Sequence, residues 1–511
     1  MEQNAIELKN VTKRFGKIVA NDSVNLSVKK GEILAILGEN GSGKTTLMNM
    51  LSGIYFPDEG QVFVDGKEVT IRSPKDAFSL GIGMIHQHFK LINILTAAEN
   101  IILGISEKEK LNINKAEKEI KELTEKYGFG LNPSQKIYDM SVSQKQTVEI
   151  VKVLYRGADI LILDEPTAVL TPQETEKLFL VLRNMRAAGK SIIIITHKLN
   201  EVLEISDRVS VLRKGKYIGT IDTKDATTSS LTEMMVGEKI SLNIERSEPK
   251  NPQKRIEIKN LTCVNSDGIK TLNQVSITAN SGEILGIAGI AGSGQKELLE
   301  AVAGLQDINS GIISYNSPEG EQIDLTGMNA LDIQKNGIKI SFVPEDRLGM
   351  GLIGSMDMTD NIMLRSYNKE KGFFVNRKKP KELASSLIEK LSISTPGTET
   401  PVGRLSGGNV QKVLVGREIA SNPTVLMLAY PVRGLDINSS YTIYNLMSEQ
   451  KKKGVAVICV IEDLDVLIEL CDRIVVLNAG EVTGRVEART TNKEEIGMLM
   501  TKGREEEAKH A

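Results

Sequence analysis

The stretch GEILAILGENGSGKTT, residues 31–46, decides the fold. Its first half is apolar, as a buried strand is, and residues 38–45 follow the spacing G-x-x-x-x-G-K-[ST]. Glycines at this spacing let backbone N–H groups converge on phosphate oxygens, at the positive end of the following helix. Lys44 and Thr45 occupy the lysine and hydroxyl positions of this motif, and a plain glycine turn does not explain that match. The stretch therefore predicts a strand, a phosphate-binding loop and a helix.

The loop residues predict the contacts of a nucleoside triphosphate. Lys44 is expected to neutralise charge on the β- and γ-phosphates, and the hydroxyl of Thr45 is expected to coordinate Mg²⁺. The residues that we expect to contact the nucleotide are Gly38, Glu39, Asn40, Gly41, Ser42, Gly43, Lys44, Thr45 and Thr46.

A second motif, ILILDEP at residues 160–166, carries an acidic pair. The apolar run places Asp164 at the C-terminal end of a buried strand, the edge at which open α/β sheets bind ligands. Asp164 is predicted to hold Mg²⁺ through water, and Glu165 to orient and deprotonate the attacking water. Acidic pairs at strand ends also serve as plain caps, so the catalytic interpretation depends on the phosphate loop.

Three further residues are candidates for the same site. His197 ends the strand-like run SIIIITH and is expected to reach the γ-phosphate, although a lone histidine after a strand is usually structural. Gln87, in GMIHQHF, is a candidate for contact with the water and the metal. Phe15 precedes the first sheet, and the sequence leaves open whether it stacks on a base or is an ordinary core aromatic.

The chain contains two copies of one domain. GEILAILG at residues 31–38 returns as GEILGIAG at 282–289, and LILDEPTAVLT at 161–171 returns as LMLAYPVRGLD at 426–436. Short apolar strands alternate with amphipathic helices that end in glycine, which predicts an α/β fold. The polar stretch 87–140 is predicted to be an inserted helical subdomain.

The repeat and the composition set the domain boundaries. We predict a first domain at residues 1–240, a polar linker at 241–254, a second domain at 255–503 and a solvated tail at 504–511. With 511 residues and a formal charge of −2, the chain offers no electrostatic case for binding nucleic acid. The three cysteines show no pairing pattern and no metal-ligand spacing. We also expect no signal peptide and no membrane-spanning helix.

With these motifs the chain resembles the ATP-binding cassette (ABC) ATPases over nearly its whole length. LSGGN at residues 405–409 is similar to the signature motif of that family. The specific resemblance is to fused tandem cassettes that drive bacterial uptake of simple sugars and nucleosides, through GIGMIHQHF, LTAAENIILG and FVPEDR. HQHF is more similar to the nucleoside branch than to the ribose and galactose branch.

The resemblance implies two ATP sites at a head-to-tail interface. Each site takes its phosphate loop, carboxylates and histidine from one copy, and its signature and D-loop from the other. The residues that would complete the site of the first copy from the second copy are Ser406, Gly407, Gly408, Asn409 and Asp436.

The second copy departs from the family pattern in its own loop, GIAGSGQK at residues 289–296. The replacements are Gln295 for the loop lysine, Ala429 and Tyr430 for the acidic pair, Glu462 for the histidine and Glu345 for the glutamine. The first copy instead departs in its signature, MSVSQ at residues 140–144, and in its D-loop, where Thr171 replaces the aspartate. All intact parts therefore belong to one composite site, and the other is expected not to hydrolyse ATP.

The resemblance implies the ATP-hydrolysing subunit of a bacterial importer, with ATP and Mg²⁺ as cofactors. Its partners would be integral-membrane permease subunits and a solute-binding protein or lipoprotein, and it would lie on the cytoplasmic face of the membrane. A nucleoside is the expected solute, with a monosaccharide of the ribose, galactose or xylose type as the alternative. The rival functions are a soluble tandem cassette acting on ribosomes or DNA, and an inert nucleotide-binding scaffold.

Overall fold

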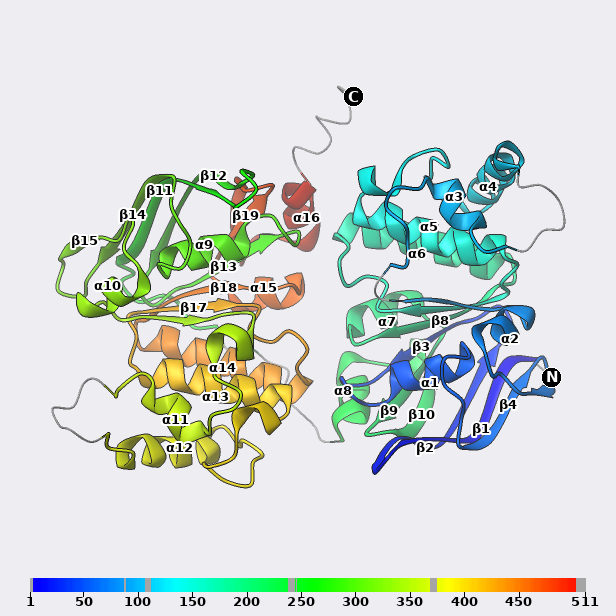
Figure 1. Ribbon diagram of the computed structural model, residues 1–511, viewed down its shortest axis with the longest axis horizontal. Helices are drawn as coiled ribbons and strands as arrows, with labels where there is room; N and C mark the ends of the chain where they lie inside the picture. Colours follow the sequence, from blue (N-terminus) through cyan, green and yellow to red (C-terminus); the bar gives the residue numbers. More distant parts are fainter. Residues whose placement is uncertain are drawn as a thin grey trace. The chain divides into compact units, whose positions relative to one another are not determined.

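The structure is a computed structural model that describes residues 3–86, 89–105, 112–237, 244, 246–367 and 375–501. The chain divides into two compact units, residues 1–241 and 242–511 (Figure 1). No helix formed by these described residues combines the length and the apolar character that a membrane span needs. Gln87 and the predicted tail, residues 504–511, lie outside the described residues.

The first unit contains two sheets. The antiparallel sheet has the order β2-β1-β4-β5, and the larger sheet has the order β10-β9-β3-β8-β7-β6, parallel except for β10. The strands of the antiparallel sheet are β1 (Asn4–Phe15), β2 (Ile18–Lys29), β4 (Glu59–Val64) and β5 (Lys67–Val69). Those of the larger sheet are β3 (Ile33–Leu37), β6 (Ile82–Ile85), β7 (Ile160–Asp164), β8 (Ser191–Thr196), β9 (Arg208–Arg213) and β10 (Lys216–Asp222).

The central strands are apolar on both faces because helices or a second sheet cover each face. Leu34 and Ile36 of β3 pack toward β1 and α1, whereas Ile33 packs toward α5 and α6. The helices of this part are α1 (Lys44–Leu51), α2 (Pro74–Ser79), α6 (Pro172–Ala187), α7 (Leu199–Ile205) and α8 (Thr228–Val236).

The predicted helical subdomain has a small core of its own. Ile101, Ile120 and Val148 are buried together in it, which explains how a polar insertion folds beside the sheet. Its helices are α3 (Ala97–Ile102), α4 (Ile113–Tyr127) and α5 (Val142–Tyr155). The prediction of an inserted helical subdomain is confirmed for this unit.

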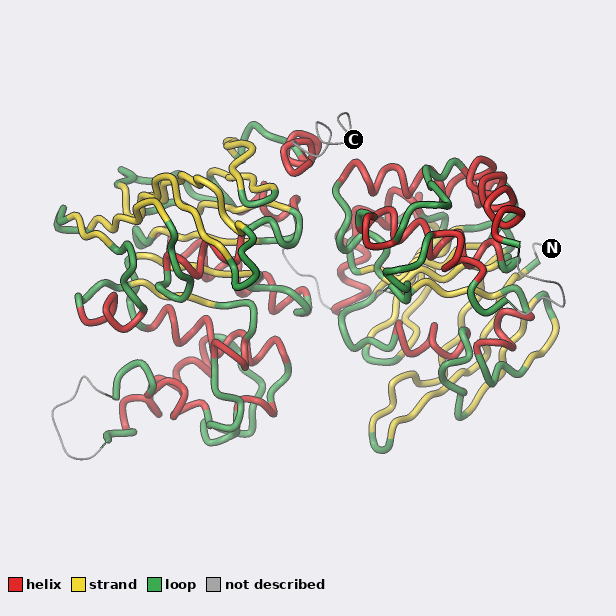
Figure 2. Tube along the Cα trace, turned by 45° about the horizontal axis from the view of Figure 1, so that its top comes forward, coloured by secondary structure: helices red, strands yellow, loops and turns green. Residues whose placement is uncertain are grey.

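The second unit repeats the same topology. Its sheets have the orders β12-β11-β14-β15 and β16-β17-β18-β13-β19-β20, and the larger order is that of the first unit read from the other edge. In Figure 2 the strands of each unit gather together, with a group of helices to one side. The strands are β11 (Lys254–Val264), β12 (Lys270–Asn280), β13 (Ile284–Gly289), β14 (Ser310–Asn316), β15 (Gln322–Asp324), β16 (Ile340–Val343), β17 (Val425–Ala429), β18 (Ala456–Val460), β19 (Arg473–Asn478) and β20 (Glu481–Glu487).

The helices of the second unit also match the repeat. They are α9 (Gln295–Val302), α10 (Ala330–Lys335), α11 (Met358–Met363), α12 (Lys378–Lys390), α13 (Gly407–Ala420), α14 (Ile437–Lys452), α15 (Leu464–Leu470) and α16 (Lys493–Thr501). Ile244, inside the stretch predicted as a linker, is buried in the core of this unit. All three cysteines are buried free thiols.

Candidate nucleotide-binding and catalytic site

The phosphate loop joins β3 to α1 and has the conformation that its glycines predict. At Gly43 the backbone φ is +96°, and a Cβ atom there would lie 2.4 Å from the carbonyl oxygen of Ala20. At Gly38 a Cβ atom would lie 2.3 Å from the carbonyl oxygen of Leu212. Glycine is therefore required at both positions, and the turn brings α1 directly onto the end of β3.

Lys44, the first residue of α1, is folded back across the loop. Its Nζ atom donates hydrogen bonds to the carbonyl oxygens of Gly38, at 2.6 Å, and Glu39, at 2.9 Å. Burial lowers the pKa of Lys44, while the nearby carboxylates of Glu165 and Asp164 oppose that shift. The amine thus lies at the centre of the loop, where it can neutralise phosphate charge.

The loop also leaves polar groups available to a ligand. Gly43 precedes α1 and has no side chain to cap it, so the first N–H groups of the helix find no partner from a capping side chain. The buried hydroxyl of Ser42 has no hydrogen-bond partner among the described residues. Buried polar atoms are rarely left unpaired, and a phosphate oxygen would satisfy these donors.

Thr45 and Asp164 lie next to each other beside the loop. The Oγ1 atom of Thr45 lies 3.4 Å from Oδ2 of Asp164, the last residue of β7. Burial raises the pKa of Asp164, and the charge of Glu165 raises it further. A hydroxyl and a carboxylate are the oxygen donors that Mg²⁺ prefers, so the pair fits a magnesium ion shared with phosphate oxygens.

Glu165 and His197 form the second pair of the site. The Nδ1 atom of His197 lies 2.9 Å from Oε1 of Glu165. This hydrogen bond is the main reason that the pKa of Glu165 is lowered, against the opposing effect of burial. Glu165 is therefore held as a carboxylate, which is the form a general base requires.

The backbone at Glu165 is strained. Its φ is +46°, and its N–H group donates to the carbonyl oxygen of Ile195 at 2.9 Å. Tyr430, at the same place in the second unit, has a φ of +48°, and its backbone N–H group donates to the carbonyl oxygen of Val460 at 3.0 Å. The second unit has thus kept the backbone of the site although the carboxylate is absent.

Phe15 is not a core residue. It ends β1, is 42% exposed and makes an edge-on contact with Tyr55, with ring centroids 5.2 Å apart. An exposed ring is compatible with base stacking, and the core alternative for this residue is wrong.

In the second unit, Gln295 takes the structural place of Lys44. Its Nε2 atom donates to the carbonyl oxygen of Ile290 at 3.0 Å, matching the bond from Lys44 to Glu39. The side chain is 1% exposed, so the loop stays closed around a neutral group. The phosphate loop fold survives in this unit without its positive charge.

Sequence reasoning missed Arg433, which occupies the eroded site of the second unit. Its guanidinium pairs with Glu345 and with Glu462, the latter at 3.3 Å, and lies 5.7 Å from the ring centre of Tyr430. Burial, followed by these two carboxylates, raises the pKa of Tyr430 to about 12. The signal was an arginine in PVRGLD at the place of Ala168, but its partners are far apart in the sequence.

The two signature segments differ in how their helices begin. Ser141 caps α5. Its hydroxyl accepts the N–H of Gln144, and the side-chain oxygen of Gln144 accepts the N–H of Ser141. Ser406 precedes α13 without a side-chain cap, and its Oγ accepts a hydrogen bond from Asn409 at 2.9 Å. The N–H groups at the start of α13 are therefore not used by a capping side chain.

The predicted signature and D-loop residues of the second unit lie together. Asp436 caps α14 by accepting the N–H of Ser439 at 2.7 Å. A Cβ atom on Gly408 would lie 2.8 Å from Oγ of Ser439 and 3.2 Å from Asp436. The glycine therefore allows α13 to pack directly on this cap.

The sequence model of ABC transporters matches residues 21–168 and again residues 272–432. The chain belongs to the ABC transporter family. It is accordingly an ABC ATPase that binds ATP, built from two tandem cassettes of α/β fold.

Three curated relatives match this ABC ATPase over nearly their whole length. The nucleoside import ATP-binding protein NupA of Lactococcus lactis is 43% identical, covering 98% of this chain and 99% of its own. The guanosine import ATP-binding protein NupO of Bacillus subtilis is 43% identical, covering 98% of each chain. The ribose import ATP-binding protein RbsA of Clostridium perfringens is 38% identical, covering 97% of each chain.

A solved structure shares the fold of the tandem ABC chain. The crystal structure of archaeal ribosomal stalk protein aP1 with the ribosome recycling factor aABCE1 matches with a TM-score of 0.60. The match covers 94% of this chain and 90% of that one, at 17% identity, so it shows the fold alone.

Proposed function

We propose that this ABC ATPase powers the import of a nucleoside through a separate membrane permease. The observation that carries the proposal is the arrangement in the first unit, in which His197 lies 2.9 Å from Glu165 and the carboxylates of Glu165 and Asp164 lie near the amine of Lys44. The similarity to nucleoside and guanosine import proteins, higher than to the ribose protein, supports a nucleoside as the solute.

Mg²⁺ fits the first site because Thr45 and Asp164 offer adjacent oxygen donors. These two residues and Gln87 would hold it, and its charge would then help to neutralise the phosphates. The chain's own residues bind the phosphates and activate the attacking water. Lys44 binds the β- and γ-phosphates, Glu165 accepts a proton from the attacking water, and His197 keeps Glu165 deprotonated and oriented. Phe15 is proposed to stack on the base.

We further infer that the site is completed in trans by residues 405–409 and by Asp436. The uncapped start of α13 supports this role, because its N–H groups suit the γ-phosphate as they would suit any anion at a helix N-terminus. At the corresponding positions the second unit has Gln295 in place of the loop lysine, Ala429 in place of the magnesium carboxylate and Tyr430 in place of the catalytic glutamate. Its own site is therefore proposed to be non-hydrolysing.

The test is transport by the whole assembly. A candidate permease and a candidate solute-binding protein would be reconstituted with this chain in lipid vesicles, with this subunit on the outer, ATP-exposed face. Nucleosides, ribose and galactose would be compared as activators of ATP hydrolysis and as transported solutes. Stimulation by a nucleoside alone supports the proposal, and stimulation by ribose alone assigns the monosaccharide alternative. Stimulation of ATPase by ribosomes instead would reject import.

A further inference from the structure

The loops that carry Glu165 and His197 begin at neighbouring strand ends of the first unit. The backbone N–H of Glu165 donates to the carbonyl oxygen of Ile195 at 2.9 Å, which ties the end of β7 to β8. Both chains then leave the sheet, since β7 ends at Asp164 and β8 at Thr196. The distance between the side chains of Glu165 and His197 therefore depends on contacts that the loops themselves make.

Three polar side chains beside this pair contact one another. The hydroxyl of Thr167 donates to Oε2 of Glu201, and Nζ of Lys198 donates to Oε1 of the same carboxylate at 2.9 Å. Nζ of Lys198 also donates to the carbonyl oxygen of Thr167 at 3.1 Å. Thr167 lies two residues after Glu165, and Lys198 directly follows His197. We call Thr167, Lys198 and Glu201 the clamp, because they join the loop of Glu165 to the loop of His197.

The clamp is largely shielded from solvent. Thr167 is 2% exposed, and the side chains of Lys198 and Glu201 are 30% and 18% exposed. Fully exposed ion pairs contribute little because water screens them, whereas hydrogen-bonded groups in a shielded network strengthen one another. The clamp is therefore able to fix the two loops relative to each other.

Lys198 occupies a position that a helix by itself does not favour. It is the N-cap residue of α7 and makes no side-chain cap bond to the helix. Ser, Thr, Asp and Asn are preferred at this position, and a positive charge there opposes the helix dipole. Glu201, in the first turn of α7, offsets that charge. Helix stability therefore does not account for Lys198, and such local conflicts are typical of functional sites.

In the second unit the clamp residues are replaced. The corresponding residues are Val432, Asp463 and Val466. Asp463 caps α15 by accepting the N–H groups of Asp465, at 2.9 Å, and Val466, at 3.4 Å. Val432 and Val466 pack as partly buried apolar side chains against the core of that unit. The unit that has Tyr430 in place of the general base thus has an ordinary helix cap in place of the clamp.

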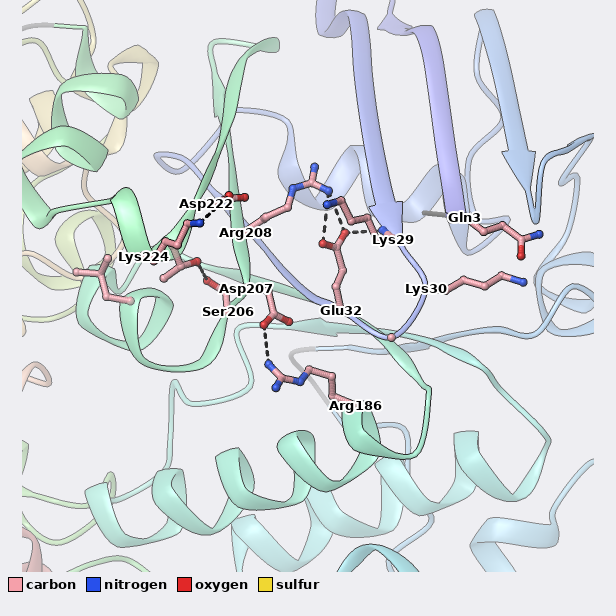
Figure 3. Close-up of a pocket in the computed structure, with 13 residues that line it drawn as sticks. Gln3, Lys29, Lys30, Glu32, Arg186, Ser206, Asp207, Arg208, Asp222 and Lys224 are labelled. Atoms are coloured by element: carbon pink, nitrogen blue, oxygen red, sulfur yellow. Dashed lines mark hydrogen bonds and ion pairs between the residues drawn. The ribbon is translucent and has the colours of Figure 1, made fainter. Parts of the chain in front are cut away.

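The other end of α7 is anchored in a way that both units share. Arg186 pairs at 2.6 Å with Asp207, which follows α7, and Asp207 accepts the N–H of Ile33 at 2.8 Å. Figure 3 shows Arg186 and Asp207 together in the cavity that they help to line. Lys451 and Asp472 form the corresponding pair of the second unit at 2.7 Å. The anchor thus belongs to the common fold, whereas the clamp accompanies the catalytic pair.

We propose that Thr167, Lys198 and Glu201 are positioning residues that hold His197 against Glu165 during ATP hydrolysis. This inference rests on the roles that the proposed function gives to Glu165 and His197. Because α7 is anchored, Glu201 is a fixed point that holds Lys198 on one side and Thr167 on the other. Without the clamp the two loops can separate, and a misplacement of about 1 Å between groups that act in a reaction can reduce the rate by about 10²-fold.

The first test introduces the residue that the second unit has at the place of Thr167. Thr167→Val keeps the shape of the side chain and removes the hydroxyl that contacts Glu201. We expect kcat for ATP hydrolysis by the full-length chain to fall about fivefold to twentyfold. The KM for ATP is expected to change less than about twofold, because the residues that bind the phosphates are untouched.

Two further variants control this test. Thr167→Ser keeps a hydroxyl and is expected to recover most of the lost turnover, and Val432→Thr in the second unit is expected to leave turnover unchanged. An unchanged kcat in Thr167→Val, or an equal loss in Thr167→Ser, overturns the proposal. Turnover that persists in Glu165→Gln would instead remove the proposed general base itself, so the two failures are distinguishable.

A double-substitution cycle separates positioning from stability. If the clamp acts through His197, Thr167→Val should reduce kcat less than about twofold in a chain that already carries His197→Ala. Glu201→Gln, which removes the charge that holds Lys198, is expected to behave in the same way. Glu204→Gln is the matched control on α7, since Glu204 pairs with Arg183 and lies outside the clamp. Equal losses with and without His197 would show a general effect on stability and would overturn the proposal.

Discussion

The Nδ1 atom of His197 lies 2.9 Å from the carboxylate of Glu165, and the two residues directly follow the neighbouring parallel strands β8 and β7 of one sheet. The hydrogen bond lowers the pKa of Glu165, against the opposing effect of its partial burial. In the second unit the same two places hold Tyr430 and Glu462, with Arg433 beside both side chains. The same backbone thus carries a proton acceptor, Glu165, in the first unit. In the second unit it carries Tyr430, beside the ion pairs of Arg433.

Removing the proton acceptor should stop hydrolysis but not binding. Glu165→Gln keeps the size of the side chain and is expected to reduce ATP turnover by ~10²–10⁴, because the general base is lost. ATP affinity, measured with a fluorescent analogue, is expected to persist. Tyr430→Phe is the control and is expected to change turnover little. Similar losses from both substitutions would refute the assignment of a single hydrolytic centre.

The pH dependence of turnover should depend on His197. A hydrogen bond from His197 lowers the pKa of Glu165, so the base stays deprotonated, and the enzyme active, to lower pH. His197→Ala removes that bond, so the pKa of Glu165 rises and the acid limb of the kcat profile moves to higher pH. His197→Gln, which keeps a donor, is expected to move it less. An acid limb unchanged in His197→Ala would contradict this role.

Lys44→Gln should separate the fold of the loop from its charge. Gln295 shows that a glutamine at this place closes the loop by donating to a carbonyl oxygen. The free energy of unfolding is therefore expected to change by less than about 1 kcal/mol, measured by denaturant unfolding. ATP affinity is expected to fall about tenfold to a hundredfold, because charge-assisted bonds to phosphate are lost. Gln295→Lys is the counterpart and should not raise turnover, since the second unit lacks the acidic pair.

The two signature serines should respond in opposite ways. Ser406→Leu is expected to reduce ATP turnover more than about tenfold, because a bulky side chain keeps the start of α13 from the γ-phosphate. Its Tm should change little, since Ser406 makes no cap bond to the helix. Ser141→Leu removes a capping box and should cost about 1 kcal/mol, a fall in Tm of about 2–4 °C. Undiminished turnover in Ser406→Leu would overturn the trans contribution.

The local parts of this protein could be predicted from its sequence. The phosphate loop at residues 38–46 is a continuous segment whose glycines, lysine and hydroxyl determine its conformation and contacts together. Asp164 and Glu165 follow an apolar run that has the length and composition of a buried strand. The internal repeat predicted two domains of one topology. In each case short-range sterics and hydrophobic burial act on neighbouring residues.

The tertiary structure alone decided which distant residues meet. Arg433 joins Glu345 and Glu462, and Arg246 donates to the carbonyl oxygens of Ile468 and Cys471 at the end of α15. No spacing in the sequence signals these contacts, because ion pairs form between groups that the chain path brings together, whatever their separation along it. The sequence by itself determined the loop, the strand-end carboxylates and the repeat, since their physics is local. The folded chain determined which distant charges are paired.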